Sequence, residues 1–509
     1  GSEMCIRDSR SIDACFLIFL IKQIGLHKLS RSILHFPAER IDAMSLSSNI
    51  DDNIKLFKEK LRAKESFDLI YRTITINKRR ACMFFIDGLL KDEVMEKVME
   101  FFYSIDDDSA MADAHTFIKT CVPYVEVDLT GDADKICMNV LSGVTALFVD
   151  GFTQAIMIDS RTYPQRETSE PEKDKSLRGS KDGFVETLIC NTALIRRRIR
   201  DPQLTVSPFV VGSVSRTDVA VCYMDNLVDK KLLGKLTREI NNIKVKSLTM
   251  NQQSLIEAIY KHKWYNPFPK VKYTERPDSA ASAILEGNII ILVDNSPSAL
   301  VLPTSIFDII EEVDDYYFPP LTGTYIRLAR YLVTFATLVI TPLWLLALKN
   351  PELIPKAFEF ILITEPVNIP VFWQLIILEL GIDGLRLASV NTPNSLSTSL
   401  SIIGAIALSD FAVTVGWFST EAMLYMAFVA IANYTQPSYE LGYSLKFLRI
   451  MLLILTQLFS IWGFIAGFVL IIVLLITNKT VSGKSYLYPL IPFNGKKLLH
   501  KVIRPQLSK

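Results

Sequence analysis

Two stretches of this 509-residue chain, LSGVTALFVDGFTQAIMI at 141–158 and LEGNIIILVDNSPSALVL at 285–302, share one pattern of apolar runs and turn residues. Each is typical of a strand, a turn and a second strand, because Asp, Asn, Gly and Pro favour turns between apolar runs. A second matched pair, FIDGL at 85–89 and YMDNL at 223–227, lies upstream in the same order. The pairs are offset by 144 positions (294 − 150) and 138 positions (225 − 87). This near-constant offset predicts a duplicated subdomain.

The matched aspartates of this pattern, Asp150 and Asp294, allow two interpretations. They are either a catalytic or metal-binding pair, or turn residues that bond their own backbone. The turn interpretation is favoured, because the chain has no phosphate-loop, dinucleotide or nucleophile-elbow motif in a strand–helix context. We therefore expect a protein that is not an enzyme and that uses no cofactor.

Short strand-like runs alternate with helical patterns from Phe67 to about Ile310, which is typical of an α/β or α+β fold. We expect a cytosolic region of two similar subdomains, followed by an all-α polytopic membrane domain. The opening GSEMCIRDS at 1–9 resembles a sequencing-adaptor artefact, so the natural start is expected at Met44. The expected divisions are a non-native leader at 1–43, subdomain 1 with a basic helix at 44–200, subdomain 2 at 201–325, a multi-pass membrane domain at 326–478 and a basic cytosolic tail at 479–509.

Composition excludes several classes of protein. Half of the residues are hydrophobic and 21% are charged, which excludes a disordered chain or a coiled coil. The net charge is +1, from 55 Lys and Arg against 54 Asp and Glu, so a nucleic-acid partner is not expected. The seven cysteines form no CxxC pair and the five histidines have no metal-ligand spacing, which indicates a metal-free protein in a reducing compartment.

The second half of the chain carries long apolar runs. The runs at 331–348, 400–418, 422–432 and 450–476 are candidate membrane spans, since a helix crosses a core of about 30 Å with about 20 apolar residues. The last run is too long for one untilted helix, and Trp462-Gly463 permits a kink or a tight hairpin there. The run at 371–390 contains three charges and either spans or re-enters the membrane.

Cationic residues near the runs predict the orientation. The tail from Asn478 to Lys509 has seven Lys and Arg and no Asp or Glu, and Arg327 and Arg330 precede the first run. Both ends are therefore expected in the cytosol, which requires an even number of crossings, four or six.

Charged residues inside the apolar half are the main functional signal. Glu379, Asp383 and Arg386 are spaced i, i+4, i+7 and share a helix face about 60° wide. Such residues normally face a bundle interior or a water-filled path, because each bare charge in lipid costs at least about 2.5–3.5 kcal/mol. They are candidates for an ion pathway or for helix packing, and Asp410 is a further candidate. Arg386 paired with Asp383 would cancel part of the field, so Glu379 is the better candidate for cation selectivity.

A basic cluster ends a predicted helix before the second copy of the repeat. Its members are Arg196, Arg197, Arg198 and Arg200. These side chains are candidates for an interface, either with acidic groups of another subunit or with lipid head groups. The alternative is a solvated helix end, where cations interact favourably with the helix dipole.

A family resemblance covers about Ser66 to Pro505. It is carried by GSKDGF at 179–184, RRRIR at 196–200, YTERPD at 273–278, LPT at 302–304, TPLW at 341–344, PSYEL at 437–441 and YPLIPF at 488–493. With these motifs the chain resembles the A subunits of bacterial spore germinant receptors, the GerA type. The motif YNPFP at 265–269 makes it look closest to the stage V sporulation protein AF branch.

The resemblance implies a spore inner-membrane protein that has a cytosolic N-terminal domain in two parts. It also implies an oligomeric channel that releases monovalent cations early in germination, together with other germination membrane proteins. Receptor A subunits work with B and C subunits, whereas the AF branch works with a different small membrane partner. Three functions follow as hypotheses: a channel-forming subunit, a scaffold or coupling subunit for a pore made by others, and a substrate-coupled transporter. The expected partners are further copies of the chain, other germination proteins and membrane lipids.

Overall fold

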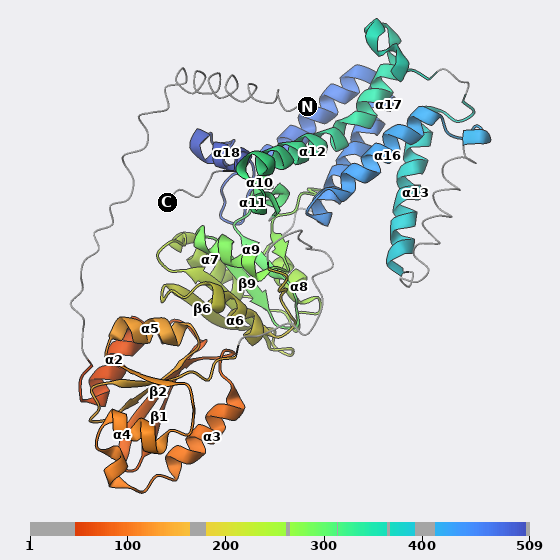
Figure 1. Cartoon of the computed structure of the whole chain (residues 1–509). Helices are drawn as coiled ribbons and strands as arrows, with labels where there is room; N and C mark the ends of the chain where they lie inside the picture. The colour runs from red at the N-terminus through yellow and green to blue at the C-terminus, as the bar shows by residue number, and fades with distance from the viewer. Residues whose placement is uncertain are drawn as a thin grey trace, which may run out of the picture. The chain divides into compact units, whose positions relative to one another are not determined.

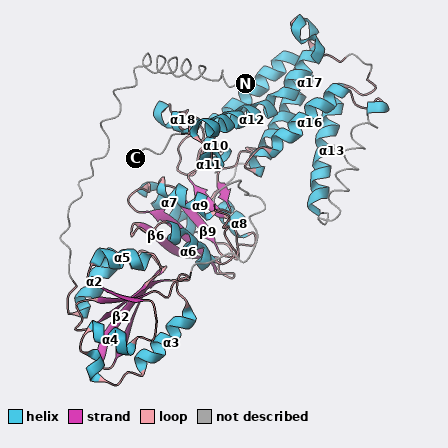
Figure 2. Cartoon of the chain, in the orientation of Figure 1, coloured by secondary structure: helices cyan, strands magenta, loops and turns pink. Residues whose placement is uncertain are grey.

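The computed structural model describes residues 46–162, 180–260, 265–312, 314–363, 367–391 and 413–504. The leader expected at 1–43 lies outside these residues. Figure 1 shows two α/β subdomains followed by a helical region, residues 306–504. The strands coloured in Figure 2 gather in the two subdomains, as the alternating sequence pattern predicts.

The first subdomain is a five-stranded antiparallel sheet with helices on both faces. Its strand order is β1-β2-β4-β5-β3. Helices α2 and α5 pack on one face and α3 and α4 on the other, so β4 is buried along its whole length. The elements are α2 (Ile50–Lys60), β1 (Leu69–Ile76), β2 (Arg79–Ile86), α3 (Asp92–Tyr103), η2 (Asp108–Met111), α4 (Ala114–Cys121), β3 (Val127–Thr130), α5 (Ala133–Leu141), β4 (Thr145–Val149) and β5 (Ala155–Ile158).

The second subdomain repeats this arrangement. Its strand order, β6-β7-β9-β10-β8, is the order of the first sheet, so the predicted duplication is confirmed in topology. Helices α6 and α9 cover one face and α7 and α8 the other. The elements are α6 (Leu188–Arg198), β6 (Leu204–Val211), β7 (Thr217–Met224), α7 (Lys230–Asn241), α8 (Asn251–Ile259), β8 (Lys272–Thr274), α9 (Pro277–Leu285), β9 (Ile289–Val293) and β10 (Ala299–Leu302).

The matched aspartates hold the same helix in each copy. Asp150 accepts a hydrogen bond from the backbone N–H of Ile50 at 3.1 Å, and Asp294 accepts one from Leu188 at 3.1 Å. Each therefore satisfies a free N–H group at the start of a helix, α2 in one copy and α6 in the other. This corrects the turn interpretation in one respect, because each carboxylate bonds the backbone of a distant helix.

Helix α6 belongs to the second subdomain by packing, since it contacts β7, β9 and α9. The sequence places the boundary between the subdomains after residue 200, whereas the packing places α6, residues 188–198, in the second subdomain. Arg196 of α6 is 1% exposed and its Nε lies 2.9 Å from Asp68 Oδ2, just before β1. A second ion pair has its cation in the first subdomain and its carboxylate in the second, because Arg62 lies 3.1 Å from Asp225. We call Arg62, Asp68, Arg196 and Asp225 the inter-subdomain clasp.

The other members of the basic cluster lie at or near the surface. Arg198 is part-buried and pairs with Asp182 at 3.1 Å, whereas Arg200 is exposed and donates to the Arg197 carbonyl at 3.4 Å. Arg196 was expected at an interface with another subunit or the membrane, and this is wrong, because its guanidinium is buried inside its own chain. Arg197 and Arg200 remain interface candidates.

The helical region contains two helices that are long and apolar enough to cross a membrane, among the residues described. They are α12 (Pro320–Lys349) and α17 (Tyr439–Thr477). The remaining elements are α10 (Ile306–Ile310), α11 (Asp314–Tyr317), η3 (Pro351–Leu353), η4 (Lys356–Ile361), α13 (Val371–Asn391), α16 (Thr420–Tyr434) and α18 (Gly495–Val502). The span predicted at 422–432 lies within α16, and most of the span at 400–418 lies outside the described residues.

Helix α17 folds back on itself. Its backbone leaves helical geometry at Ser460, where φ is 51°. A Cβ atom added to Gly463 would lie 1.9 Å from the Leu455 carbonyl oxygen, and one added to Gly467 would lie 3.0 Å from Leu452. Eight residues of straight helix span about 12 Å, so these contacts require two antiparallel arms. Of the two possibilities that the sequence left open near Trp462-Gly463, a kink or a tight hairpin, these contacts show the hairpin, and glycine is needed where the arms meet.

The inter-subdomain clasp generates a stability prediction. Arg196→Gln should lower the free energy of unfolding by about 3–5 kcal/mol, because it leaves the Asp68 carboxylate buried without its cation. Urea unfolding of the detergent-solubilised chain measures this loss. The matched control, Arg200→Gln, removes an exposed guanidinium of the same cluster and should change stability by less than about 0.5 kcal/mol. Equal unfolding midpoints for the two variants would contradict the structural role of Arg196.

Candidate functional site

The charges of α13 meet cations of α17 inside the helical region. The Nε of Arg449 lies 2.6 Å from Glu379 Oε1, and its Nη1 donates to the Thr337 carbonyl of α12 at 2.9 Å. Lys446 pairs with Asp383, and its Nζ lies 3.8 Å from Glu379 Oε2. We call Glu379, Asp383, Lys446 and Arg449 the α13–α17 ion cluster.

This cluster is balanced in charge, and all of its members except Asp383 are buried. Glu379 is 3% exposed and Arg449 is 1% exposed, so the helices shield both side chains from their surroundings. Two carboxylates face two cations, which removes most of the cost of holding each charge away from water. The cluster joins α12, α13 and α17, and each of its members depends on a partner from another helix.

Arg386 has different neighbours from those expected. Its guanidinium carbon lies 4.9 Å from the ring centre of Tyr439, 5.0 Å from that of Tyr443 and 5.7 Å from that of Tyr434. An arginine among aromatic faces gains cation–π attraction. The ion partner of Asp383 is Lys446, so Arg386 links α13 to α16 and α17 instead. Asp410 lies outside the described residues.

Sequence reasoning missed Lys446 and Arg449. The predicted apolar run at 450–476 begins directly after these two residues and so does not include them. Their i, i+3 spacing places both cations on one helix face. This spacing could have indicated a cationic face opposite the carboxylates of 371–390.

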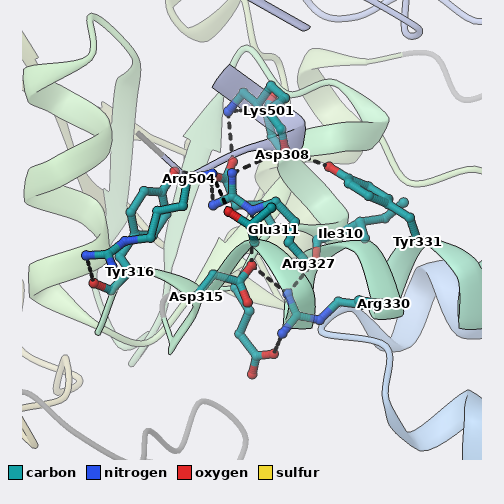
Figure 3. Close-up of polar contacts among 12 residues, drawn as sticks. Asp308, Ile310, Glu311, Asp315, Tyr316, Arg327, Arg330, Tyr331, Lys501 and Arg504 are labelled. Carbon is teal, nitrogen blue, oxygen red and sulfur yellow. Dashed lines mark hydrogen bonds and ion pairs between the residues drawn. The ribbon is translucent and has the colours of Figure 1, made fainter. Parts of the chain in front are cut away.

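A second ion cluster lies where the second subdomain meets α12. Acidic residues of α10, α11 and the turn between them face cations of α12 and the tail, as Figure 3 shows. Arg330 bonds Asp315 at 2.8 Å and Glu312 at 2.6 Å. We call the set the junction ion cluster, and its members are Asp308, Glu311, Glu312, Asp315, Arg327, Arg330 and Lys501.

Lys501 of α18 ties the tail to this cluster. Its Nζ lies 2.6 Å from Asp308 Oδ1 and 2.8 Å from Glu311 Oε2. Burial disfavours the ionised form of both acids, but Lys501 outweighs it, helped by Ser305 at Asp308 and by Lys272 and Tyr316 at Glu311, so the pKa of each acid lies below the ordinary value. Burial likewise opposes the charge on Lys501, and the two carboxylates nevertheless raise its pKa. All three groups therefore remain ionised at neutral pH.

Backbone groups complete the contact between the tail and α12. Arg327 Nη1 donates to the carbonyls of His500 and Lys501, each at 3.2 Å, and its Nη2 lies 3.2 Å from Glu311. Arg504 donates to the carbonyls of Phe318 and Tyr316. These bonds satisfy carbonyls near helix ends that lack partners within their own helix. In the sequence, Arg327 and Arg330 indicated only orientation, and the acidic run EEVDD at 311–315 was the unused signal.

A cavity of about 800 Å³ lies beside the junction ion cluster. It is bounded by the second subdomain, α12 and the turn between α16 and α17, and its lining includes Tyr273, Glu311, Arg330, Tyr434, Gln436 and Glu440. Within the described ranges no group of three His, Cys, Asp or Glu side chains is placed to hold a metal ion. The described cysteines are free thiols, and burial raises the pKa of Cys82 to about 12.

The pKa shifts of the junction predict how stability depends on pH. Lowered carboxyl pKa values stabilise the fold above the unfolded values of 3.8 and 4.5, and this contribution is lost as the pH falls through the folded values. The raised pKa of Lys501 stabilises the fold below 10.5 and is lost as the pH rises through the folded value. Lys501→Met should therefore lower the melting temperature near neutral pH and have progressively less effect below about pH 4.

Thermal unfolding of the solubilised chain between pH 3 and pH 9 checks this expectation. Lys496→Met is the control, since Lys496 is an exposed lysine of the same helix. A Lys501→Met effect that is the same at pH 3 and pH 7 would show that the ion pairs do not stabilise the junction.

Comparison with known proteins identifies the family. Residues 55–509 match the family described as Bacillus/Clostridium GerA spore germination protein. Stage V sporulation protein AF of Bacillus subtilis (strain 168) is 36% identical, over 92% of this chain and 95% of its own length. Spore germination protein KA of the same organism is 28% identical, over 89% of this chain and 83% of its own length.

A solved structure also matches about half of the chain. The N-terminal domain of the A subunit of the Bacillus megaterium spore germinant receptor GerK3 is 25% identical, with a TM-score of 0.38, and the match covers 51% of this chain and 96% of that domain. The family match extends over most of the sequence, and the relative with 36% identity is of the expected AF type. The resemblance found in the sequence is thus confirmed, and the chain belongs to the Bacillus/Clostridium GerA family of spore germination proteins.

Proposed function

We propose that the chain is a membrane subunit of a spore germination complex, in which several copies form a path for monovalent cations. Its site is the spore inner membrane, with multiple crossings and with both termini in the cytosol. The role is not enzymatic, in keeping with relatives named as sporulation and germination proteins. Other germination membrane proteins and lipids are its further partners.

The course of the helices supports this topology. The start of α12 contacts the tail through Arg327 and Arg504, and the two arms of α17 return to the same end. Helices α13 and α16 run parallel, since Gln374 bonds Ser419 at their starts and Arg386 lies over Tyr434 at their ends. Parallel neighbours need a return between them, which supports the span predicted at 400–418. These contacts support the proposal of an even number of crossings.

The α13–α17 ion cluster is the observation that carries the proposal. Ionisable side chains inside a bundle of apolar helices normally mark a packed interior or a water-filled path. The cluster is balanced in charge, so neutralising one carboxylate leaves an excess positive charge and neutralising one cation leaves an excess negative charge. A path close to it would respond to that sign.

A scaffold or coupling subunit is the second candidate function. One observation favours it: both carboxylates are neutralised by cations of the same chain. The junction ion cluster would then transmit movements of the second subdomain to α12, and the pore would be made by other subunits.

Reconstitution of the purified chain in planar bilayers tests the proposal. Glu379→Gln leaves Arg449 uncompensated, so the cation-to-anion permeability ratio should fall. Arg449→Gln leaves Glu379 and Asp383 facing Lys446 alone, with one negative charge in excess, so the ratio should rise. Reversal potentials across a salt gradient measure both changes, and the double variant should lie near the wild type.

The control is Glu359→Gln, because Glu359 is an exposed carboxylate on η4, outside the cluster. Arg386→Gln should mainly reduce expression or assembly, since it removes the contacts with three tyrosines. Currents with no shift of reversal potential in either single variant would make the cluster a packing element away from the path. Absence of any current from the wild-type oligomer would favour the scaffold function.

A further inference from the structure

Helix α18 is amphipathic, and its apolar face is only partly covered, because Leu498 and Val502 are half-buried whereas Leu499 and Ile503 are exposed. At about 100° per residue, Leu498, Leu499, Val502 and Ile503 fall within an arc of about 140°, whereas Lys496, Lys497, His500 and Lys501 fall on the opposite side. Leu499 is 57% exposed and Ile503 is 45% exposed. The preceding segment continues this surface with Phe493, which is 75% exposed. So much apolar surface beside lysines is typical of a helix that lies in a membrane interface.

The contacts of α18 place it at the level of the first turns of α12. The Arg504 N–H bonds Thr324 Oγ1 at 3.2 Å, and the Tyr331 hydroxyl donates to the Lys501 carbonyl at 3.3 Å. Helix α12 has 30 residues and is therefore about 45 Å long, against a hydrocarbon core of about 30 Å. This excess length leaves room for its first turns, which carry Arg327 and Arg330, in the head-group layer, and α18 lies beside them.

The charges of α18 fit the same location. Lys501 on the cationic side bonds Asp308 and Glu311 of the junction ion cluster. Lys496 and Lys497 are exposed, and the tail from Asn478 to Lys509 contains no acidic residue. Each Lys or Arg next to an anionic leaflet contributes about 1 kcal/mol to the free energy of membrane binding, which is a factor of about five in affinity for the lipid.

We propose that α18 and the segment 488–494 form an interfacial anchor, in which the apolar face enters the cytosolic leaflet and Lys496 and Lys497 bind anionic phospholipid head groups. This rests on the membrane location given under the proposed function, but it does not require a channel. Since Lys501 sits on the same helix, the anchor connects lipid charge directly to the junction ion cluster.

Photo-crosslinking of the full chain in nanodiscs tests the depth of the helix. A benzophenone amino acid replaces Leu499 or Ile503 on the apolar face, or Lys496 on the cationic side as the control. Mass spectrometry should find adducts with lipid acyl chains at the first two positions, at least fivefold more than at Lys496. Adducts of Leu499 and Ile503 with a second protein chain, or none with lipid, would overturn the proposal.

The charge requirement is tested separately in nanodiscs that contain phosphatidylglycerol and phosphatidylcholine. Lys496→Gln/Lys497→Gln should lower the phosphatidylglycerol enrichment around the protein by up to about 25-fold, at about fivefold per lysine. Lys97→Gln, an exposed lysine on α3, should leave the enrichment unchanged. An unchanged enrichment in the double variant would overturn the role of the two lysines. Currents recorded from the same samples separate this result from the proposed function, because lipid contact without current would refute only the channel.

Discussion

A charge that leaves water needs an opposite charge beside it, and this constraint organises the chain beyond its two sheets. Arg196, Arg327 and Arg449 are each 1% exposed, and each meets a carboxylate from a different element. One pair joins the two subdomains, the next joins the segment after α10 to α12, and the last joins α13 to α17. Because a buried unpaired charge is far more costly than a surface one, these contacts fix which elements are neighbours.

The two copies of the subdomain differ in the side chains with which they contact each other. The matched N–H groups of Asp87 and Asp225 donate to the carbonyls of Asp68 in the first copy and Gln203 in the second. Asp68 and Gln203 therefore occupy equivalent positions. The first copy has a carboxylate there, which receives Arg196, and the second has an amide, which receives Arg62 at 3.2 Å. The sheets kept their strand order, and the difference lies in side chains at the contact between them.

Sequence reasoning recovered features that depend on local pattern. The strand–turn–strand repeat around Asp150 and Asp294 is visible because turn residues and apolar runs recur at one offset. The break in α17 was likewise predictable, since its apolar run is too long for one untilted helix and has a glycine near its middle, but the sequence did not decide between a kink and a hairpin. The ion partners were not visible. Glu379 and Arg449 are 70 positions apart, and periodicity shows the face of a helix but not the helix that will cover it. The partner of Asp150, 100 positions away at the start of α2, was missed for the same reason.

The contact between Arg327 and the carbonyl of His500 spans 173 positions of the chain. A ribosome makes α12 long before it makes the tail, so Arg327 first has only the nearby acids Glu311 and Asp315 as partners. The carbonyls of His500 and Lys501 become available only after a further 173 and 174 positions have been synthesised. The junction therefore cannot close fully before the tail is made, and a nascent chain that ends early leaves Arg327 without these backbone partners.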